Sequence, residues 1–214
     1  MTVTLSRADV FDGVQLANST TNPEREPSHF SQGIMRFSSD LTSRLLWQGS
    51  MLYRKSKVGF DKFGIDGQGR AAYQDDTNSA AKEETWLVQN SLTYKVTSNW
   101  NTNLQLGFTQ LATSINAGPL QNGVTSRLFL ANWRNTHTLI DDDKQKLQWH
   151  VIWGGQGQHE QGTSPTSGFS QERTMASGFI DTQAQYGNLS AEAGVRVEHF
   201  DQFGDHPLFK TAAA

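Results

Sequence analysis

The feature that most constrains this chain is the two-residue alternation in residues 126–162, interrupted once by an acidic turn at residues 141–144. The apolar parity holds Phe129, Ala131, Trp133 and Leu139 before the turn, and Leu147, Trp149, Val151 and Trp153 after it. After the turn, only Ile152 breaks the polar parity. Alternation with a period of two predicts β-strands, and aspartates favour a turn because they hydrogen-bond their own backbone.

The same pattern recurs along the chain, so we predict an all-β protein of about ten antiparallel strands. Further strands are predicted at residues 2–11, where the alternation is weak, and at 31–41, 44–57, 85–96, 104–109, 175–186 and 189–198, with a last one beginning after residue 205; residues 85–96 show the clearest alternation. Most are about ten to fourteen residues long, against a usual five or six. No proline falls in the interior of a predicted strand, as a closed ladder would require. A length of about ten to fourteen residues is typical of strands that cross a membrane.

The connections between these strands alternate in length. Short turns are predicted at residues 41–43, 97–100, 141–144 and 187–188, and long polar loops at residues 12–27, 60–83, 116–125 and 161–171. Long hairpins with short turns at one end and long loops at the other are typical of an outer-membrane barrel. The loop at residues 60–83 is unusually long for a compact domain, which favours a functional role.

Composition narrows the function classes. The net charge of −3 and the scattered basic residues give no field that would attract nucleic acid. No run of about 18 apolar residues exists, which excludes a membrane-spanning helix, whereas alternating strands average to a polar score such as the mean hydropathy of −0.57. Cysteine is absent, so disulfides, thiolate chemistry and cysteine zinc sites are excluded.

Aromatic residues favour a membrane sheet over a soluble one. Trp86 and Tyr94 share a face and lie about 26 Å apart along the strand, or about 19 Å in height at a tilt of about 45°. That height approaches the apolar band between aromatic girdles. The opposite face carries Arg36, Arg54, Arg134, Glu192, Arg196 and Glu198, which fit a wet lumen better than a dry core. A soluble all-β domain with the tryptophans inside is the alternative.

Three segments resemble a known family. Residues 132–139 (NWRNTHTL), 195–204 (VRVEHFDQFG) and 209–213 (FKTAA) are similar to the barrel of TonB-dependent outer-membrane receptors, and most similar to the vitamin B12 and siderophore branch. The resemblance implies a 22-stranded barrel in the bacterial outer membrane, closed by a plug. Residues 1–214 would then be a partial barrel, a fragment without the plug domain and closing strands.

The same resemblance implies function and partners. The whole protein would import a scarce ligand with energy from the inner membrane, and would not be an enzyme. Its partners would be the lipid bilayer, the TonB energy-coupling complex acting through the plug, and a small-molecule metal chelate or cobalamin. No cofactor is expected.

Candidate ligand-binding residues follow from the predicted loops and lumen. They are Asp75 and Asp76 in the long loop, with Arg54, Arg134, Arg196 and Glu198 on the inward face; the loops at residues 116–125 and 161–171 would add contacts. No catalytic residue is predicted, and the six histidines lack metal-ligand spacing.

Two alternatives stay open. A complete ten-stranded outer-membrane protease would use loop residues such as Asp201, Asp205 and His206, and it would end in a finished strand. A passive porin segment would differ from the receptor in lacking a plug.

Overall fold

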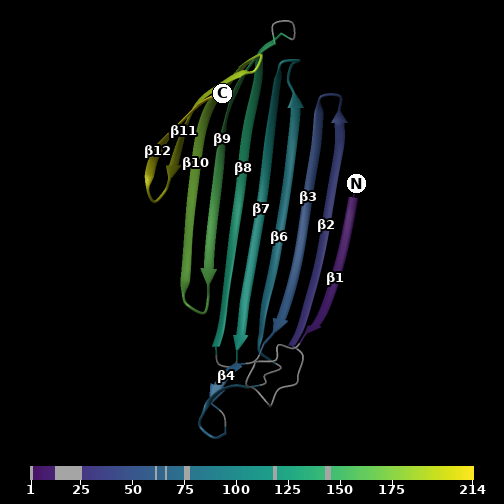
Figure 1. The fold of residues 1–214 in the computed structure, drawn as a ribbon, viewed down its shortest axis with the longest axis vertical. Coiled ribbons are helices and arrows are strands. Elements are labelled where there is room, and N and C mark those ends of the chain that lie inside the picture. The colour runs from purple at the N-terminus through teal and green to yellow at the C-terminus, as the bar shows by residue number, and fades with distance from the viewer. Residues whose placement is uncertain are drawn as a thin grey trace.

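One long antiparallel sheet makes up most of the chain in the computed structural model (Figure 1). The structure describes residues 2–12, 26–60, 62–65, 67–74, 78–117, 120–142 and 146–214. The strands are β1 (Thr2–Asp12), β2 (Glu26–Thr42), β3 (Leu45–Gly59), β4 (Lys62–Ile65), β5 (Ala71–Gln74), β6 (Ala80–Lys95), β7 (Trp100–Ala117), β8 (Leu120–Asp142), β9 (Leu147–Ser164), β10 (Phe169–Tyr186), β11 (Leu189–Phe200) and β12 (Gly204–Ala213). The predicted all-β antiparallel fold is confirmed.

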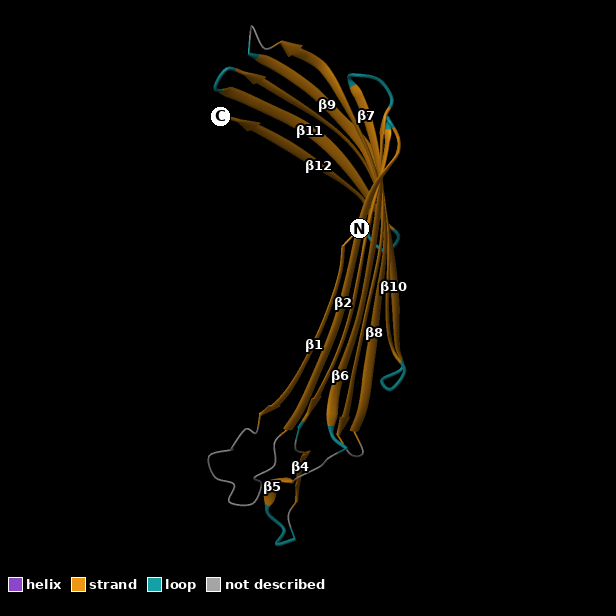
Figure 2. Cartoon of the chain, turned by 90° about the vertical axis from the view of Figure 1, so that its right-hand side faces the viewer, coloured by secondary structure: helices purple, strands orange, loops and turns teal. Residues whose placement is uncertain are grey.

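Ten strands lie side by side in chain order, and β4 pairs separately with β5. Figure 2 shows the large sheet as a single curved layer, with the β4–β5 hairpin beyond one end of the strands. β1 and β12 stand at the two ends of the strand order, and within the described residues each pairs on one side only. The described part of the chain contains no helix that is long and apolar enough to cross a membrane.

The hairpin at residues 126–162 forms as expected, because β8 pairs with β9 in a ladder that sets Asn132 opposite Gln156. The register shifts once, between Thr138 and Ile140. The predicted turns at residues 97–100 and 187–188 also fall between paired strands.

Three predicted loops are wrong in part. The segment at residues 60–83 contains the β4–β5 hairpin, and β6 already begins at Ala80. At residues 116–125, β7 runs to Ala117 and β8 starts at Leu120, while at residues 161–171 only residues 165–168 separate β9 from β10. In each case polar and glycine-rich sequence extends a strand because a neighbouring strand supplies the ladder hydrogen bonds. Of the predicted loop at residues 12–27, residues 13–25 lie outside the described part of the chain.

Proline is not excluded from the strands either. Pro207 lies within β12, opposite Val197. Its missing N–H breaks no hydrogen bond to β11, because Val197 and Pro207 form a pair of the ladder that exchanges no backbone hydrogen bond.

The pairing register sorts the side chains onto two faces, since directly opposed residues share a face. One ladder row joins Trp47, Leu92, Leu104 and Trp133, and we call this side the apolar face. The adjacent row joins Gln48, Ser91, Gln105, Asn132 and Gln156, and we call this side the polar face. All six charged residues predicted to face inward lie on the polar face, as the register requires.

The described part of the chain has almost no hydrophobic core of its own. Its buried apolar residues are Ala80, Ile152 and Met175. Large apolar side chains stay open instead, with Leu106 at 49% and Phe129 at 50% exposure. A single layer leaves both faces uncovered, so the apolar face needs an apolar surrounding that these residues do not supply.

One glycine is required for the β8–β9 ladder to close. A Cβ at Gly154 would collide with the backbone carbonyl of Trp133, whereas a Cβ at Gly157 on the same strand would meet nothing within 4 Å. The backbones of β8 and β9 therefore approach too closely at Gly154 for any side chain.

We expect Gly154→Ala to lower the free energy of unfolding by about 1–3 kcal/mol, the usual cost of forcing atoms into occupied space. The measurement is urea unfolding of the full chain in detergent micelles, followed by tryptophan fluorescence. Gly157→Ala is the matched control and should unfold like the native chain. Equal effects of the two substitutions would contradict the predicted steric cause.

Candidate functional site

Aromatic rings pair along the apolar face, from the end with the long connections to the short-turn end. Near the end with the long connections, Tyr53 packs on Trp86 with ring centroids 4.4 Å apart, and Phe108 packs on Phe129 at 4.8 Å. Near the short-turn end the pairs are Phe37–Trp47, Trp100–His137 and Trp133–Trp153, with centroids 4.5, 4.9 and 5.1 Å apart. Trp86 and Tyr94 share the apolar face, as the sequence predicted.

Within the described strands, five of the six indole N–H groups on this face, all but that of Trp153, donate to partners in the sheet. Trp133 Nε1 donates to Thr102 Oγ1 at 2.9 Å, and Trp149 Nε1 donates to Thr182 Oγ1 at 2.7 Å. Trp86 Nε1 donates to Glu84 Oε1 at 2.9 Å. Each ring thus keeps an apolar surface outward while its one polar group is paired, which suits a boundary between apolar and polar surroundings.

Exposure in β11 is the reverse of that in a water-soluble sheet. From Ala191 to His199, every residue of the apolar face is exposed, including Val195 and Val197, whereas Glu192, Arg196 and Glu198 on the polar face are half-buried. β10 shows the same order, with Ile180 exposed and Met175 on the polar face buried. The polar side chains here cover one another, and the apolar ones point outward alone.

On β9–β12, the polar side chains that cover one another form a network of charged groups and amides. Glu192 accepts a hydrogen bond from Gln183 Nε2 at 3.0 Å and pairs with Lys210. Arg196 Nη2 donates to Gln156 Oε1 at 2.9 Å, and its Nε lies 2.7 Å from Glu198 Oε1. The network links four neighbouring strands, β9 to β12, and offers both charge signs to anything that lies against this face.

Polar atoms with spare hydrogen-bonding capacity lie within the same network. Asp181 Oδ1 and Ser177 Oγ are buried and have no hydrogen-bond partner in the described part of the chain. Asp181 is opposite Gly194, where an added Cβ would come within 3.1 Å of its carboxyl carbon, so the glycine makes room for the carboxylate.

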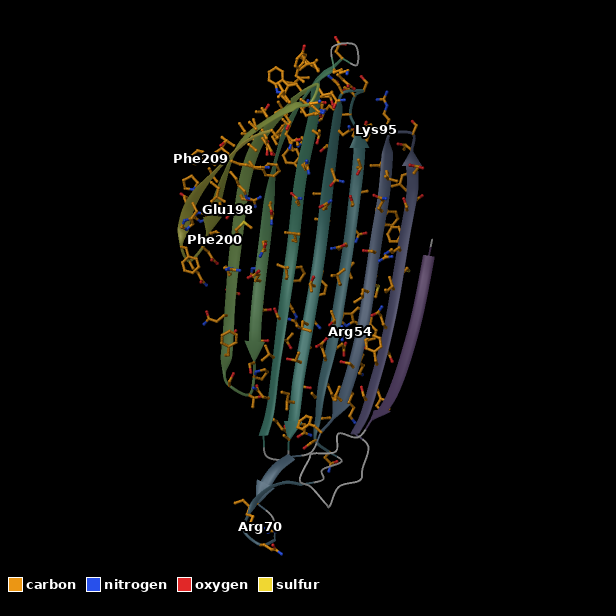
Figure 3. All side chains as sticks on the ribbon, viewed as in Figure 1. Arg54, Arg70, Lys95, Glu198, Phe200 and Phe209 are labelled. Atoms are coloured by element: carbon orange, nitrogen blue, oxygen red, sulfur yellow. The ribbon has the colours of Figure 1, made fainter. Side chains whose placement is uncertain are left out.

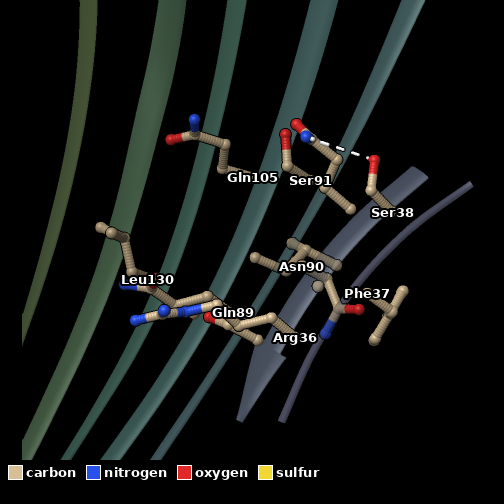
Figure 4. Close-up of a pocket in the computed structure, with 13 residues that line it drawn as sticks. Arg36, Phe37, Ser38, Gln89, Asn90, Ser91, Gln105 and Leu130 are labelled. Atoms are coloured by element: carbon tan, nitrogen blue, oxygen red, sulfur yellow. Dashed lines mark hydrogen bonds between the residues drawn. The ribbon is translucent and has the colours of Figure 1, made fainter. Parts of the chain in front are cut away.

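A second feature of the polar face is a groove of about 520 Å³ over β2, β3, β6 and β7 (Figure 4). Most of its polar lining comes from two adjacent ladder rows, which supply Arg36, Ser38, Gln48, Ser50, Gln89, Ser91 and Gln105; Asn90 adds a further amide. Gln48 Nε2 donates to Ser38 Oγ at 3.5 Å, and Gly107 leaves the floor open. The groove can offer hydrogen bonds and one positive charge to a ligand.

The predicted site residues do not form one cluster. Arg196 and Glu198 meet in the network, and Arg134 lies in the ladder row of Arg196. Arg54 lies elsewhere: its ladder row reaches β8 at Ser126, eight residues or about 26 Å along the strand from Arg134. Figure 3 shows Arg54 and Glu198 far apart on the sheet.

Local contacts also distinguish these residues. Arg54 lies 3.9 Å from Glu83 and over the ring of Phe30 at 5.1 Å, in a more exposed position than Arg196. Asp75 and Asp76 lie outside the described residues. Within the residues that are described, no group of three or more His, Cys, Asp and Glu side chains could hold a metal ion.

Several candidate residues did not emerge from the sequence. Asp181, Gln183 and Lys210 join the network, and Gln48 and Gln105 line the groove. Their polar parity was visible in the alternation, but their clustering depends on which strand rows face each other.

The loop residues considered for a protease have structural partners. Asp201 Oδ2 accepts a hydrogen bond from the Thr174 N–H at 3.0 Å, and Asp205 Oδ1 lies 2.7 Å from His199 Nδ1. The ring of His206 lies 5.9 Å from that of Phe200. These contacts order the turn between β11 and β12.

The fold is similar to that of solved transporters. With the RagAB peptide transporter the TM-score is 0.62 at 12% identity, covering 88% of this chain and 30% of that chain. With the ferric citrate transporter FecA in its unliganded form it is 0.62 at 10% identity, covering 88% and 33%. The RagAB peptide importer in its closed-closed state gives 0.60 at 10% identity.

This chain therefore spans about a third of the length of the chains it matches, since it covers 30% and 33% of them. These neighbours are TonB-dependent receptors, and they are transporters, not enzymes. At such low identities the likeness establishes the fold: the large sheet is built like the wall of an outer-membrane receptor barrel. No protein-family model and no curated protein matches the sequence.

We expect Arg196→Met to cost about 1.5–3 kcal/mol of unfolding free energy, because a half-buried guanidinium loses charge-assisted hydrogen bonding and leaves Glu198 unpaired. Arg54→Met should cost at most about 1 kcal/mol, since its ion pair with Glu83 is long and exposed. Urea unfolding in detergent micelles measures both. Equal losses, or a larger loss for Arg54→Met, would contradict the expectation that the network around Arg196 stabilises the fold more than the exposed Arg54–Glu83 pair does.

Proposed function

We propose that this chain is part of the wall of an energy-coupled transport barrel in a bacterial outer membrane. The reversed exposure of β10 and β11 carries the proposal. A face with exposed valine, leucine and tryptophan side chains is stable only against an apolar phase, and polar side chains that cover one another suit an enclosed lumen.

Two further observations support the lipid contact. The strands of the large sheet are ten to 23 residues long, whereas about 9–11 tilted residues suffice to cross the hydrocarbon. On β6 and β7, aromatic residues stand eight positions apart, as Trp86 and Tyr94 and as Phe108 and Trp100. This spacing corresponds to about 19 Å of height in a strand tilted by about 45°.

We further propose that residues 1–214 are a partial barrel. The two edge strands offer unpaired backbone groups, and in a membrane every such group needs a partner. The transporters of similar fold are about three times as long as this chain, which covers 30% and 33% of them. We propose that the whole protein also contains the remaining strands and a plug domain, and that a TonB energy-coupling complex would act through this plug.

A closed ten-stranded barrel, as the protease alternative requires, would pair β1 with β12. Within the described residues these strands stand at opposite ends of the sheet order. The residues proposed for catalysis also have structural contacts at the β11–β12 turn. The open sheet therefore favours the larger transport barrel.

For the ligand we propose a small-molecule metal chelate or cobalamin, bound by polar-face residues and loops. Arg134, Arg196 and Glu198 would contact it in the lumen, and Arg54 nearer the long connections. Asp75 and Asp76 would contact it from the connection between β3 and β6. Mixed charge and amide donors in an enclosed space recognise a chelate whose surface carries carboxylate and amide oxygens.

The test of the membrane arrangement uses the absence of native cysteine. Single cysteines at Leu106 and Val195 on the apolar face, and at Gln105 and Ser126 on the polar face, receive a nitroxide label in the whole barrel protein that contains residues 1–214, refolded into phosphatidylcholine vesicles. We expect oxygen to relax the first pair more strongly and a water-soluble nickel complex to relax the second pair, because oxygen concentrates in hydrocarbon. Equal access of the nickel complex to all four positions would refute the proposal.

The test of ligand contact uses the whole protein in outer-membrane vesicles and a panel of radiolabelled ferric chelates and cobalamin. We expect Arg134→Gln to weaken binding of the recognised compound by about tenfold, the usual effect of losing one charge-assisted hydrogen bond. Arg127→Gln, on the apolar face of the same strand, is the matched control and should bind normally. If Arg127→Gln weakens binding equally, Arg134 has no special role in the lumen.

A further inference from the structure

A row of basic residues crosses the apolar face beyond the Tyr53–Trp86 pair, toward the end with the long connections. The ladder sets Lys57 of β3 directly opposite Lys82 of β6, and it sets His29 of β2 opposite Lys57 on the other side. Two residues nearer to the Tyr53–Trp86 pair along the strands, Lys55 stands opposite Glu84. The three lysines are exposed, and all of these residues share the face of Tyr53 and Trp86.

This placement is costly without an anion. Like charges directly opposite each other on neighbouring strands destabilise a sheet. Lys55, Lys57 and Lys82 have no ion pair in the described part of the chain, and the Glu84 carboxylate is engaged by the Trp86 indole N–H at 2.9 Å. Asp9 stands opposite His29 in the register, so His29 is left out of the site, which consists of the three lysines.

Height along the strands identifies what would neutralise them. Lys57 lies four residues beyond Tyr53, and Lys82 lies four residues beyond Trp86. Four residues correspond to about 13 Å along the strand, or about 9 Å in height at a tilt of about 45°. The headgroup layer outside the hydrocarbon is about 5–8 Å thick, and a lysine stem can bend to keep its ammonium in that layer.

We infer that Lys55, Lys57 and Lys82 form a binding site for the phosphate of an anionic lipid headgroup, at the end of the strands with the long connections. The inference rests on the proposed function, because it requires the apolar face to contact a bilayer. A phosphate between Lys57 and Lys82 converts a repulsive pair into two charge-assisted contacts. The packed rings of Tyr53 and Trp86 lie just below, where the acyl chains of the same lipid begin.

The test places the whole barrel protein that contains residues 1–214 in vesicles of phosphatidylcholine and phosphatidylglycerol, one of the two carrying brominated acyl chains. Bromine quenches tryptophan fluorescence on contact, so exchanging the brominated lipid gives the relative affinity of the protein surface for the anionic lipid. We expect the native chain to prefer phosphatidylglycerol. Each lysine replaced among K55Q, K57Q and K82Q should lower that preference by about fivefold.

The matched control is the triple variant R44Q, K95Q and K146Q, which removes the same charge at the short-turn end. Lys95 lies at the opposite end of the strands from Arg54 (Figure 3). These three residues form no ladder row on the apolar face, so the control should keep the native preference. An equal loss in both triple variants would overturn the inference, since it would show a diffuse effect of net charge.

Three other results would also overturn it, and they separate it from the proposed function. Quenching by both lipids without preference would refute the lysine site and leave the membrane arrangement standing. Absence of quenching by either lipid would refute both. Loss of the preference on adding an equal concentration of inorganic phosphate would show that the lysines bind free phosphate instead of a lipid.

Discussion

Backbone pairing across one unbacked layer is the constraint on which the rest of the structure depends. Inside the sheet each interior strand satisfies its N–H and C=O groups on two neighbours, so the backbone needs neither water nor a second layer. What remains open is the character of the two faces and of the two edges. The side chains settle the faces, and β1 and β12 leave the edges unpaired within the described residues.

The two faces are held by different interactions. On the apolar face, ring pairs such as Tyr53–Trp86 and Trp133–Trp153 hold neighbouring strands together, and the indole N–H groups of Trp86 and Trp133 donate to oxygen atoms inside the sheet. On the polar face, contacts change along the strand order. β2 to β7 carry mainly neutral amides and hydroxyls around the groove, whereas β9 to β12 carry the charged network centred on Glu192 and Arg196.

Much of this was predictable because a strand has a period of two. Once residues 126–162 were assigned as a hairpin, the faces of Trp133, Arg134 and Trp149 followed without knowledge of neighbouring strands. Loop boundaries were not predictable in the same way. Residues 116–125 are rich in turn formers, and only the pairing of Ala117 with Leu120 shows that the strands continue almost to the hairpin tip.

Clusters that span strands were the least predictable, because they depend on register. Lys57 and Lys82 are 25 positions apart, and nothing local indicates that they meet. The same holds for Glu192 and Lys210, which pair across β11 and β12. Pro207 was misjudged for a related reason: whether a strand tolerates proline depends on its place at the sheet edge.

Exposure also indicates which way the sheet curves. On a curved layer, side chains crowd together on the concave side and spread apart on the convex side. Along β10 and β11 the polar face is the crowded one: Met175 is buried there with no second layer above it, while Ile180 and Val197 on the apolar face stay half open. Ile152, which interrupts the polar parity after the turn, is buried on the same side, two residues from Gly154. The polar face is therefore concave over these strands, which is the curvature that a polar lumen inside a lipid-facing wall requires.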